Sequence, residues 1–228
     1  EMQRSLVGSE MCIRDSIYKA LEDIARERKL TSEERAEMKK YSKLADAFTP
    51  LAKGMNSEYA NQNGYDCIQV HGGSGFMLEY ACQRIYRDAR ITSIYEGTTQ
   101  LQTVAAIRYV TNGFYSSVIE DYAQMPVAQE LEGIKSRVAA MAEKFNASVA
   151  KVKEAENQEL HDLCARHLYE MAADVIMCQL LMQNASKAPE IFVHSLEVYA
   201  NHAEAEVAKH ATLVERMTVE QLDNYRQA

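Results

Sequence analysis

Apolar residues recur at helical spacing through the first half of the chain. Residues 17–30 carry one such stripe, made of Ile17, Ala20, Leu21, Ile24 and Ala25. Thr31 followed by Glu34 is a capping-box pattern, which predicts that a new helix begins there. Thr49-Pro50 predicts the start of a further helix, because proline is favoured at the first helical position.

A glycine-rich segment interrupts this pattern at residues 71–76, which read H-G-G-S-G-F. Glycine lets a backbone approach another group closely, so the segment predicts a turn against a neighbour or a ligand. A short helix is predicted over 80–89 and irregular backbone over 91–95. A threonine N-cap near residue 98 then begins another helix, which ends at Asn-Gly 112–113.

The pattern changes again after residue 120, where three long amphipathic helices are predicted at about 127–156, 158–185 and 189–217. The middle helix carries a wide apolar stripe of Leu163, Leu168, Met171, Ala172, Val175, Ile176 and Leu180. Short connections between long helices favour an antiparallel three-helix bundle. The predicted fold class is therefore all-α, with one helical bundle followed by a three-helix extension.

The N-terminal segment does not share in these patterns. Residues 5–16 show no helical or strand period that joins the helix after them, and they lack the charged and apolar regions of a signal peptide. We expect residues 1–16 to be a non-native segment, residues 17–120 to form a helical domain, and residues 121–228 to form the helical extension.

Composition and charge exclude several classes of function. The net charge of −8 is unlike that of a typical nucleic-acid-binding protein. No apolar run approaches the roughly 20 residues of a membrane span. The five cysteines form no C-x-x-C pair and no histidine cluster has zinc-ligand spacing, so no metal site is expected. Free thiols in a reducing compartment are the expectation, and with it a bacterial cytoplasmic location.

Residues 69–108 hold the candidate chemistry, in two features. One is the glycine-rich turn, and the other is the carboxylate of Glu96, which an E-G-T-T step places just before a helix N-terminus. Most glycine-rich turns are simply turns. A glutamate beside a helix start is also common, because it complements the helix dipole. Neither feature alone indicates an enzyme.

Together, however, the two features resemble the C-terminal signature of the acyl-CoA dehydrogenase family. That signature has the form Q-x-x-G-G-x-G-[YF]-x-x-[ED]-[YF], followed by R-D-[AS]-[RK]-I-x-x-I-Y-E-G-T. The residues that fall in register are Gln69, Gly72, Gly73, Gly75, Phe76, Glu79, Tyr80, Arg87, Asp88, Ala89, Arg90, Ile91, Ile94, Tyr95, Glu96, Gly97, Thr98, Leu101 and Gln102. The resemblance extends more weakly over residues 17–110 and covers under half of a full family member.

The resemblance implies a substrate site around Glu96. Glu96 is the implied base that removes the α-proton of an acyl-CoA thioester, and its backbone N–H is an implied donor to the thioester carbonyl oxygen. Tyr95 and Gly97 complete the implied substrate-binding set. Arg87 and Asp88 are expected to form a structural ion pair, since pairing is the usual way to place an arginine in a packed region.

The resemblance also implies FAD as the cofactor and a homo-oligomer as the working form. The segment Gln69, Val70, His71, Gly72 and Gly73 is the implied contact to the ADP half of a neighbouring subunit's FAD. The implied contacts to the FAD bound beside Glu96 are Thr98, Thr99 and Gln100. Electron-transfer flavoprotein, or a similar acceptor, is the implied redox partner.

Three departures from the signature fall in one loop. Ser74 replaces the usual aromatic residue, Ala81 follows Tyr80 where proline is usual, and Gln83 replaces a glutamate. They bear on the shape of the loop and on chain-length preference, and they remove no implied catalytic group.

The length of the segment after residue 120 indicates which members of the family the chain resembles most. A chain that continues about a hundred residues past the glutamate-bearing helix resembles the longer bacterial members, a group that includes 3-methylmercaptopropionyl-CoA dehydrogenases. We expect the 228-residue chain to be a fragment that is inactive alone. The alternative is a non-catalytic helical interaction module, or a flavoprotein of this fold that has lost dehydrogenase activity.

Overall fold

The computed structural model describes residues 19–227, and these residues form helices and connecting turns without a β-strand. The expectation for residues 1–16 concerns residues outside the described part of the chain. The described residues fall into two compact units, one before Ala106 and one from Ala106 onward. This division lies inside helix α6, earlier than the boundary after residue 120 that the sequence suggested.

The first unit is organised around one long helix. Its elements are α2 (Lys19–Glu27), α3 (Ser32–His71), α4 (Gly73–Phe76), α5 (Ala81–Thr92) and the start of α6 (Thr99–Thr111). The capping box predicted at the start of α3 is confirmed. The Glu34 amide donates to the Thr31 hydroxyl oxygen over 3.2 Å, and the Thr31 amide donates to the Glu34 carboxylate over 2.8 Å.

The predicted helix break at Thr49-Pro50 is wrong, because α3 continues through Pro50 for 40 residues. Proline removes one backbone donor and crowds the preceding turn, which disfavours a helix interior. Here the Thr49 hydroxyl donates to the Ala45 carbonyl over 2.8 Å, and the flanking Phe48 and Leu51 are fully buried. Packing of this central segment of α3 therefore outweighs the local cost of proline.

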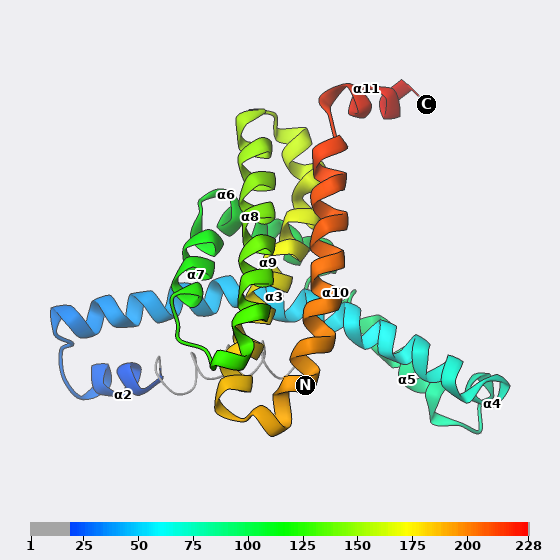
Figure 1. The fold of residues 1–228 in the computed structure, drawn as a ribbon, viewed down its shortest axis with the longest axis horizontal. Helices are drawn as coiled ribbons and strands as arrows, with labels where there is room; N and C mark the ends of the chain where they lie inside the picture. Colours follow the sequence, from blue (N-terminus) through cyan, green and yellow to red (C-terminus); the bar gives the residue numbers. More distant parts are fainter. Residues whose placement is uncertain (1–18, 228) are drawn as a thin grey trace. The chain divides into compact units, whose positions relative to one another are not determined.

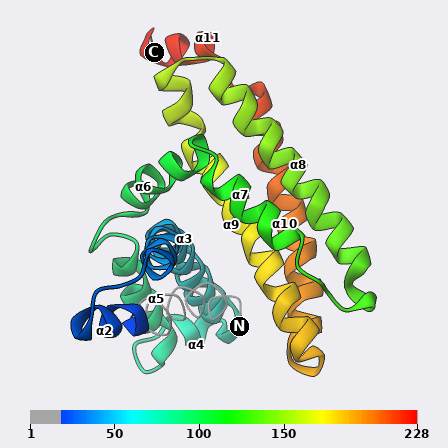
Figure 2. The same ribbon diagram turned by 90° about the vertical axis from the view of Figure 1, so that its left-hand side faces the viewer.

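The second unit contains the helices predicted for the extension. Its elements are the rest of α6, α7 (Phe114–Ala123), the 3-10 turn η2 (Gln129–Leu131), α8 (Glu132–Glu154), α9 (Gln158–Lys187), α10 (Pro189–Arg216) and α11 (Val219–Gln227). Figures 1 and 2 both show α8, α9 and α10 side by side, and short turns connect them in antiparallel order. The predicted all-α fold and its three-helix extension are confirmed.

Helix α9 forms the centre of this second unit, because it contacts α7, α8, α10 and α11. Its predicted apolar stripe is buried from Leu168 to Ile176, whereas Leu163 and Leu180 are only half-buried. None of the described helices is both long enough and apolar enough to cross a membrane.

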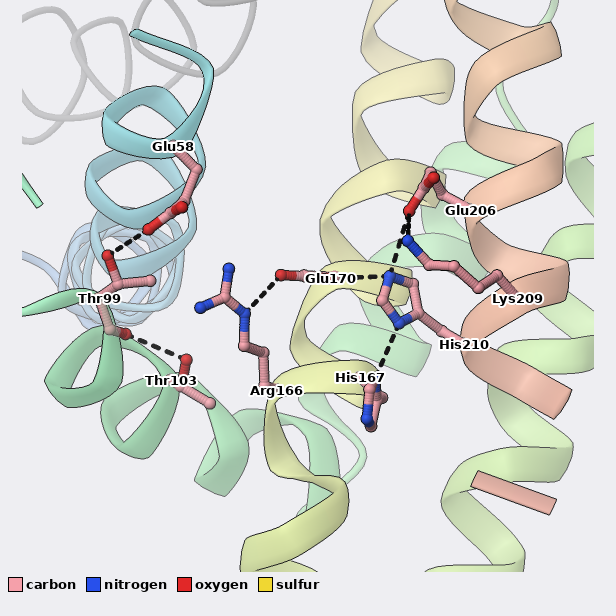
Figure 3. Close-up of polar contacts among 9 residues, drawn as sticks. All are labelled: Glu58, Thr99, Thr103, Arg166, His167, Glu170, Glu206, Lys209 and His210. Atoms are coloured by element: carbon pink, nitrogen blue, oxygen red, sulfur yellow. Dashed lines mark hydrogen bonds and ion pairs between the residues drawn. The ribbon is translucent and has the colours of Figure 1, made fainter. Parts of the chain in front are cut away.

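A polar network lies between α9 and α10 inside this otherwise apolar bundle. Figure 3 shows the Glu170 carboxylate between Arg166 and His210, at 2.7 Å from the Arg166 Nε atom and 2.8 Å from the His210 Nε2 atom. Burial raises the pKa of Glu170, but the hydrogen bonds from His210 and Arg166 outweigh that effect and lower it to about 2. Glu170 is therefore ionised, and two basic groups hold it in place.

Asp174 is the most deeply buried carboxyl of the same helix, and it accepts a 2.7 Å hydrogen bond from the Tyr199 hydroxyl. Burial raises its pKa to about 7, although the hydrogen bond from Tyr199 opposes the shift. The unfolded carboxyl titrates near pH ~4. Between these two values the folded chain keeps a proton that the unfolded chain loses, so the stability falls as the pH rises through that window.

We therefore expect Asp174→Asn to be more stable than the wild type at pH 8, by on the order of 2 kcal/mol. The amide oxygen still accepts from Tyr199, but no charge has to be buried. The difference between the two proteins should shrink toward zero near pH ~4, where the unfolded carboxyl is protonated too. Urea unfolding at a series of pH values measures this. Asp121→Asn, at an exposed position, is the control, and a destabilised Asp174→Asn at pH 8 contradicts the account.

Candidate functional site

The turn between α5 and α6 presents Glu96 in a strained backbone conformation. Glu96 has a φ of 51° and Gly97 a φ of 94°, both in the left-handed region. Left-handed backbone costs a residue with a side chain roughly 1–2 kcal/mol. Such strain persists only where surrounding contacts impose it, and it concentrates at functional sites.

Lys53 supplies the contacts that impose this conformation. It projects from the middle of α3, and its Nζ atom donates to three backbone carbonyls of the turn, those of Thr92, Tyr95 and Gly97. The distances to the Tyr95 and Gly97 oxygens are 3.0 Å and 2.9 Å. All three ammonium donors are thus used, and the residues on both sides of Glu96 are held by the same cation.

The start of α6 fixes the other end of the turn. The Thr98 hydroxyl oxygen accepts from the Leu101 amide over 3.2 Å, which confirms the predicted threonine cap. The Thr99 side chain is buried, and its hydroxyl donates to the Glu58 carboxylate of α3 over 2.7 Å, as Figure 3 shows. A larger residue at Gly97 would be strained because of the φ of 94°, and its Cβ atom would lie 2.7 Å from the Gln102 Nε2 atom, which would have to move aside.

The residues implied to meet the substrate and the near cofactor lie on the accessible side of this turn. Tyr95, Glu96 and Gln100 are exposed, and Thr98 is half-buried. An open concavity of about 550 Å³ adjoins the turn, and its lining is Tyr86, Arg87, Asp88, Arg90, Ile91 and Ile94. Contiguity in the sequence brings Tyr95, Glu96, Gly97 and Thr98 together, but Thr99 differs from the others because its hydroxyl points inward to Glu58.

Arg87 and Asp88 do not form the ion pair that we expected. Both side chains are exposed and line the open concavity, and no ion pair joins them within the described residues. They are consecutive residues of α5, and consecutive residues of a helix point in different directions rather than toward each other.

The second predicted group, Gln69 to Gly73, lies at the C-terminal end of α3. All five residues are exposed, and Gly72 has a φ of 60°. Nothing lies within 4 Å of the position that a Cβ atom would take on Gly72 or Gly73. Gly75 is different, because a Cβ atom there would lie 2.6 Å from the Ile68 carbonyl oxygen. The turn therefore closes on α3 through Gly75 and leaves the backbone of Gly72 and Gly73 open.

The two groups lie far apart along α3. Lys53 contacts the Glu96 turn, and Gln69 comes sixteen residues later in the same helix. At 1.5 Å per residue this separates them by about 24 Å along the helix axis. The structure thus brings the predicted site residues together as two separate groups, one around Glu96 and one around Gly72.

Family comparisons match nearly the whole chain. Residues 6–110 match the family described as "Acyl-CoA dehydrogenase, C-terminal domain", and residues 111–222 match "Acyl-CoA dehydrogenase C terminal". The chain belongs to the acyl-CoA dehydrogenase family. The first match begins within residues 1–16, the segment expected to be non-native, and the two matches meet within α6.

Curated acyl-CoA dehydrogenases resemble part of the chain. The mitochondrial long-chain specific acyl-CoA dehydrogenase of Sus scrofa is 40% identical over 70 residues, which are 31% of this chain and 16% of that protein. An acyl-CoA dehydrogenase of Bacillus subtilis (strain 168) is 38% identical over 63 residues, covering 28% of this chain and 17% of that protein. The matched part is thus about a sixth of each relative's length.

Two solved structures share the fold over a longer span. The Bacillus anthracis acyl-CoA dehydrogenase complexed with FAD superposes with a TM-score of 0.67 at 20% identity, over 93% of this chain and 40% of that one. Caenorhabditis elegans ACDH-11 in complex with C11-CoA gives a TM-score of 0.57 at 21% identity, over 86% of this chain and 32% of that one. At this identity the likeness concerns the fold alone, and it includes the C-terminal helices that follow the signature.

Proposed function

We propose that this chain is the C-terminal part of an FAD-dependent enzyme that oxidises an acyl-CoA thioester to the 2,3-enoyl-CoA, with Glu96 as the base. The observation that carries the proposal is the strained, exposed Glu96 within a Y-E-G-T turn that Lys53 holds by three carbonyls. A glutamate that only capped a helix would need neither the left-handed backbone nor this support.

The chemistry explains why the turn takes this form. The α-C–H of a thioester is a very weak acid, so a carboxylate removes its proton only when donors stabilise the charge that develops on the carbonyl oxygen. The backbone N–H of Glu96 is the proposed donor. Bound substrate would exclude water from around the Glu96 carboxylate and place it against the α-carbon, where it can act as the base. Glu96 then holds the abstracted α-proton.

The residues present fit FAD as the cofactor. Gln100 is exposed beside Glu96, and the open backbone at Gly72 and Gly73 leaves room for a diphosphate to approach. FAD accepts the substrate's β-hydrogen as hydride when it is bound. The separation of about 24 Å along α3 supports contacts to two different FAD molecules, the second one belonging to another copy of the chain.

The test is an assay of a longer protein in which flavin-binding N-terminal and barrel parts precede this chain. With an acyl-CoA and an artificial electron acceptor, mass spectrometry should find a product that has lost two hydrogens. The isolated 228-residue chain should purify without stoichiometric flavin absorbance and show no turnover. Turnover by the isolated chain, or none by the longer protein with any acyl-CoA tested, contradicts the proposal.

The proposal also predicts self-association of the chain. Several large apolar side chains of the first unit are exposed, namely Val70, Phe76, Leu78, Ile91, Ile94, Leu101 and Val104. We propose that these side chains form a contact surface, since contiguous exposed apolar surface is typical of an interaction site. Light scattering should show the mean mass rising with concentration, and Leu78→Ser with Ile91→Ser should reduce that rise. Val198→Ser removes an equally exposed valine from α10 and should not. A chain that stays monomeric at all concentrations contradicts the prediction.

A further inference from the structure

Two thiols and an imidazole converge at the C-terminal end of α3. Cys67 and His71 lie one turn apart on α3, and Cys82 lies in the first turn of α5. The ligand atoms of the three side chains all lie within 4.8 Å of one another. Within the described part of the chain, no other three histidine, cysteine or carboxylate side chains lie close enough together to hold a metal ion.

The geometry suits a thiophilic cation. In a tetrahedral zinc site, bonds of about 2.0–2.3 Å place the ligand atoms roughly 3.3–3.8 Å apart. The His71 Nδ1 atom lies 4.0 Å from the Cys67 Sγ atom, so side-chain movements of about 1 Å or less would bring the ligands to bonding distance. An i, i+4 pair on one helical face is a spacing that zinc sites use.

The surroundings of the three side chains favour a metal over a plain thiol pair. The His71 ring lies beside Cys67, because its Nδ1–H donates to the Cys67 carbonyl oxygen over 2.9 Å, and binding of an ion at Nδ1 would replace this hydrogen bond by a metal bond. Cys82 is buried whereas His71 is exposed, so the group offers a protected sulfur at its base and access for an ion from solvent.

We propose that Cys67, His71 and Cys82 form a binding site for zinc, with water as the fourth ligand. The site would join the end of α3 to the start of α5. The glycine-rich turn with α4 lies between these two points, and Figure 1 shows the three elements together. Zinc would therefore brace the turn that presents Gly72 and Gly73, and this role is independent of whether the turn meets FAD.

The first experiment titrates the reduced 228-residue chain with Co²⁺, a spectroscopic substitute for Zn²⁺, and then displaces it with Zn²⁺. A thiolate-to-cobalt charge-transfer band should saturate at one equivalent and disappear on adding zinc. Cys67→Ser, Cys82→Ser and His71→Ala should weaken zinc binding by more than the roughly 10–100-fold that loss of an outer-shell partner costs. Because His71 is exposed, His71→Ala should fold normally.

Two matched controls separate this site from other thiols and histidines. Cys164→Ser removes a buried thiol of α9, and His194→Ala removes an exposed imidazole of α10. Both variants should bind cobalt like the wild type. Absence of the charge-transfer band in the wild type overturns the proposal, as does equal zinc affinity in the wild type and the three ligand variants.

The second experiment measures the bracing effect without spectroscopy of the metal. Chymotrypsin should cut the chain at Phe76, the exposed last residue of the glycine-rich turn, or at the exposed Leu78 just after it. Zinc should slow this cleavage at least several-fold in the wild type and not in His71→Ala. Cleavage that zinc leaves unchanged in the wild type overturns the proposed site. The rate at which a mild oxidant forms the Cys67–Cys82 disulfide is a further readout, and zinc should lower it. An equal rate with and without zinc also overturns the proposed site.

Discussion

Replacing Glu96 by glutamine in the longer enzyme should lower turnover by at least roughly 10²–10⁴-fold, the usual cost of losing a general base. Glutamine keeps the size of the side chain and its hydrogen-bonding capacity but lacks the basic carboxylate. The backbone N–H, Thr98 and Gln100 remain, so acyl-CoA and flavin should still bind. Under anaerobic conditions, reduction of the flavin by acyl-CoA can be followed by stopped-flow as loss of flavin absorbance. The rate of this loss should fall by the same factor as turnover.

The matched control for this prediction is Glu33→Gln, which removes the same charge from an exposed position in the first turn of α3. It should leave turnover unchanged. If Glu96 only complemented the dipole of α6, Glu96→Gln would cost less than about 1 kcal/mol of stability and would hardly change the rate. Wild-type turnover in Glu96→Gln would therefore place the base on another residue.

Replacing Lys53 by methionine should destabilise the chain by about 2–3 kcal/mol, because the ammonium group makes charged hydrogen bonds to three carbonyls that then lose their donor. Methionine keeps the length of the side chain and its packing along α3. Denaturant unfolding of the isolated 228-residue chain measures this effect directly. In the longer enzyme turnover should also fall, by roughly 10²-fold if Glu96 moves by about 1 Å.

Lys39→Met is the control, because Lys39 is an exposed lysine of the same helix. It should change neither the free energy of unfolding nor turnover appreciably. Lys53→Arg should recover part of the stability, since it restores a cation with several donors. A Lys53→Met variant as stable and as active as the wild type would show that the turn keeps its form without the ammonium group.

Local signals in the sequence predicted most of the helices. The Thr31–Glu34 capping box, the Asn112-Gly113 stop and the Pro189 start act over a few residues, and the structure places helix ends at each of them. The wide apolar stripe of α9 likewise predicted burial, because helical periodicity directly reports which face meets other helices. The family signature added the Glu96 turn, whose function periodicity alone does not indicate.

The features that the sequence did not predict depend on contacts between distant residues. Pro50 reads as a helix start, and only the burial of Phe48 and Leu51 shows that α3 continues through it. Lys53 lies 39 to 44 residues from the carbonyls that it binds. One signal of its role was available, since a lysine stands between the apolar residues of Leu51–Met55.

The cysteine cluster was missed for the same reason. Metal sites are usually recognisable from C-x-x-C pairs or histidine clusters, whereas Cys67 and His71 are one helical turn apart and Cys82 follows only after the glycine-rich turn. The apolar periodicity of α9 also does not predict the polar network of Glu170 and Asp174, because both residues are polar and interrupt the apolar stripe. Their partners His210 and Tyr199 come from another helix.

The most direct test of the role of Glu96 is the exchange of the substrate's α-hydrogen with solvent. A non-oxidisable acyl-CoA analogue that keeps an acidic α-hydrogen is incubated in D₂O with the longer enzyme, and deuterium uptake at the α-carbon is followed by NMR. The wild type should catalyse uptake, and Glu96→Gln should reduce the rate by at least roughly 10²-fold, because exchange requires only the base. Uptake at the wild-type rate in Glu96→Gln would contradict the assignment of Glu96 as the base.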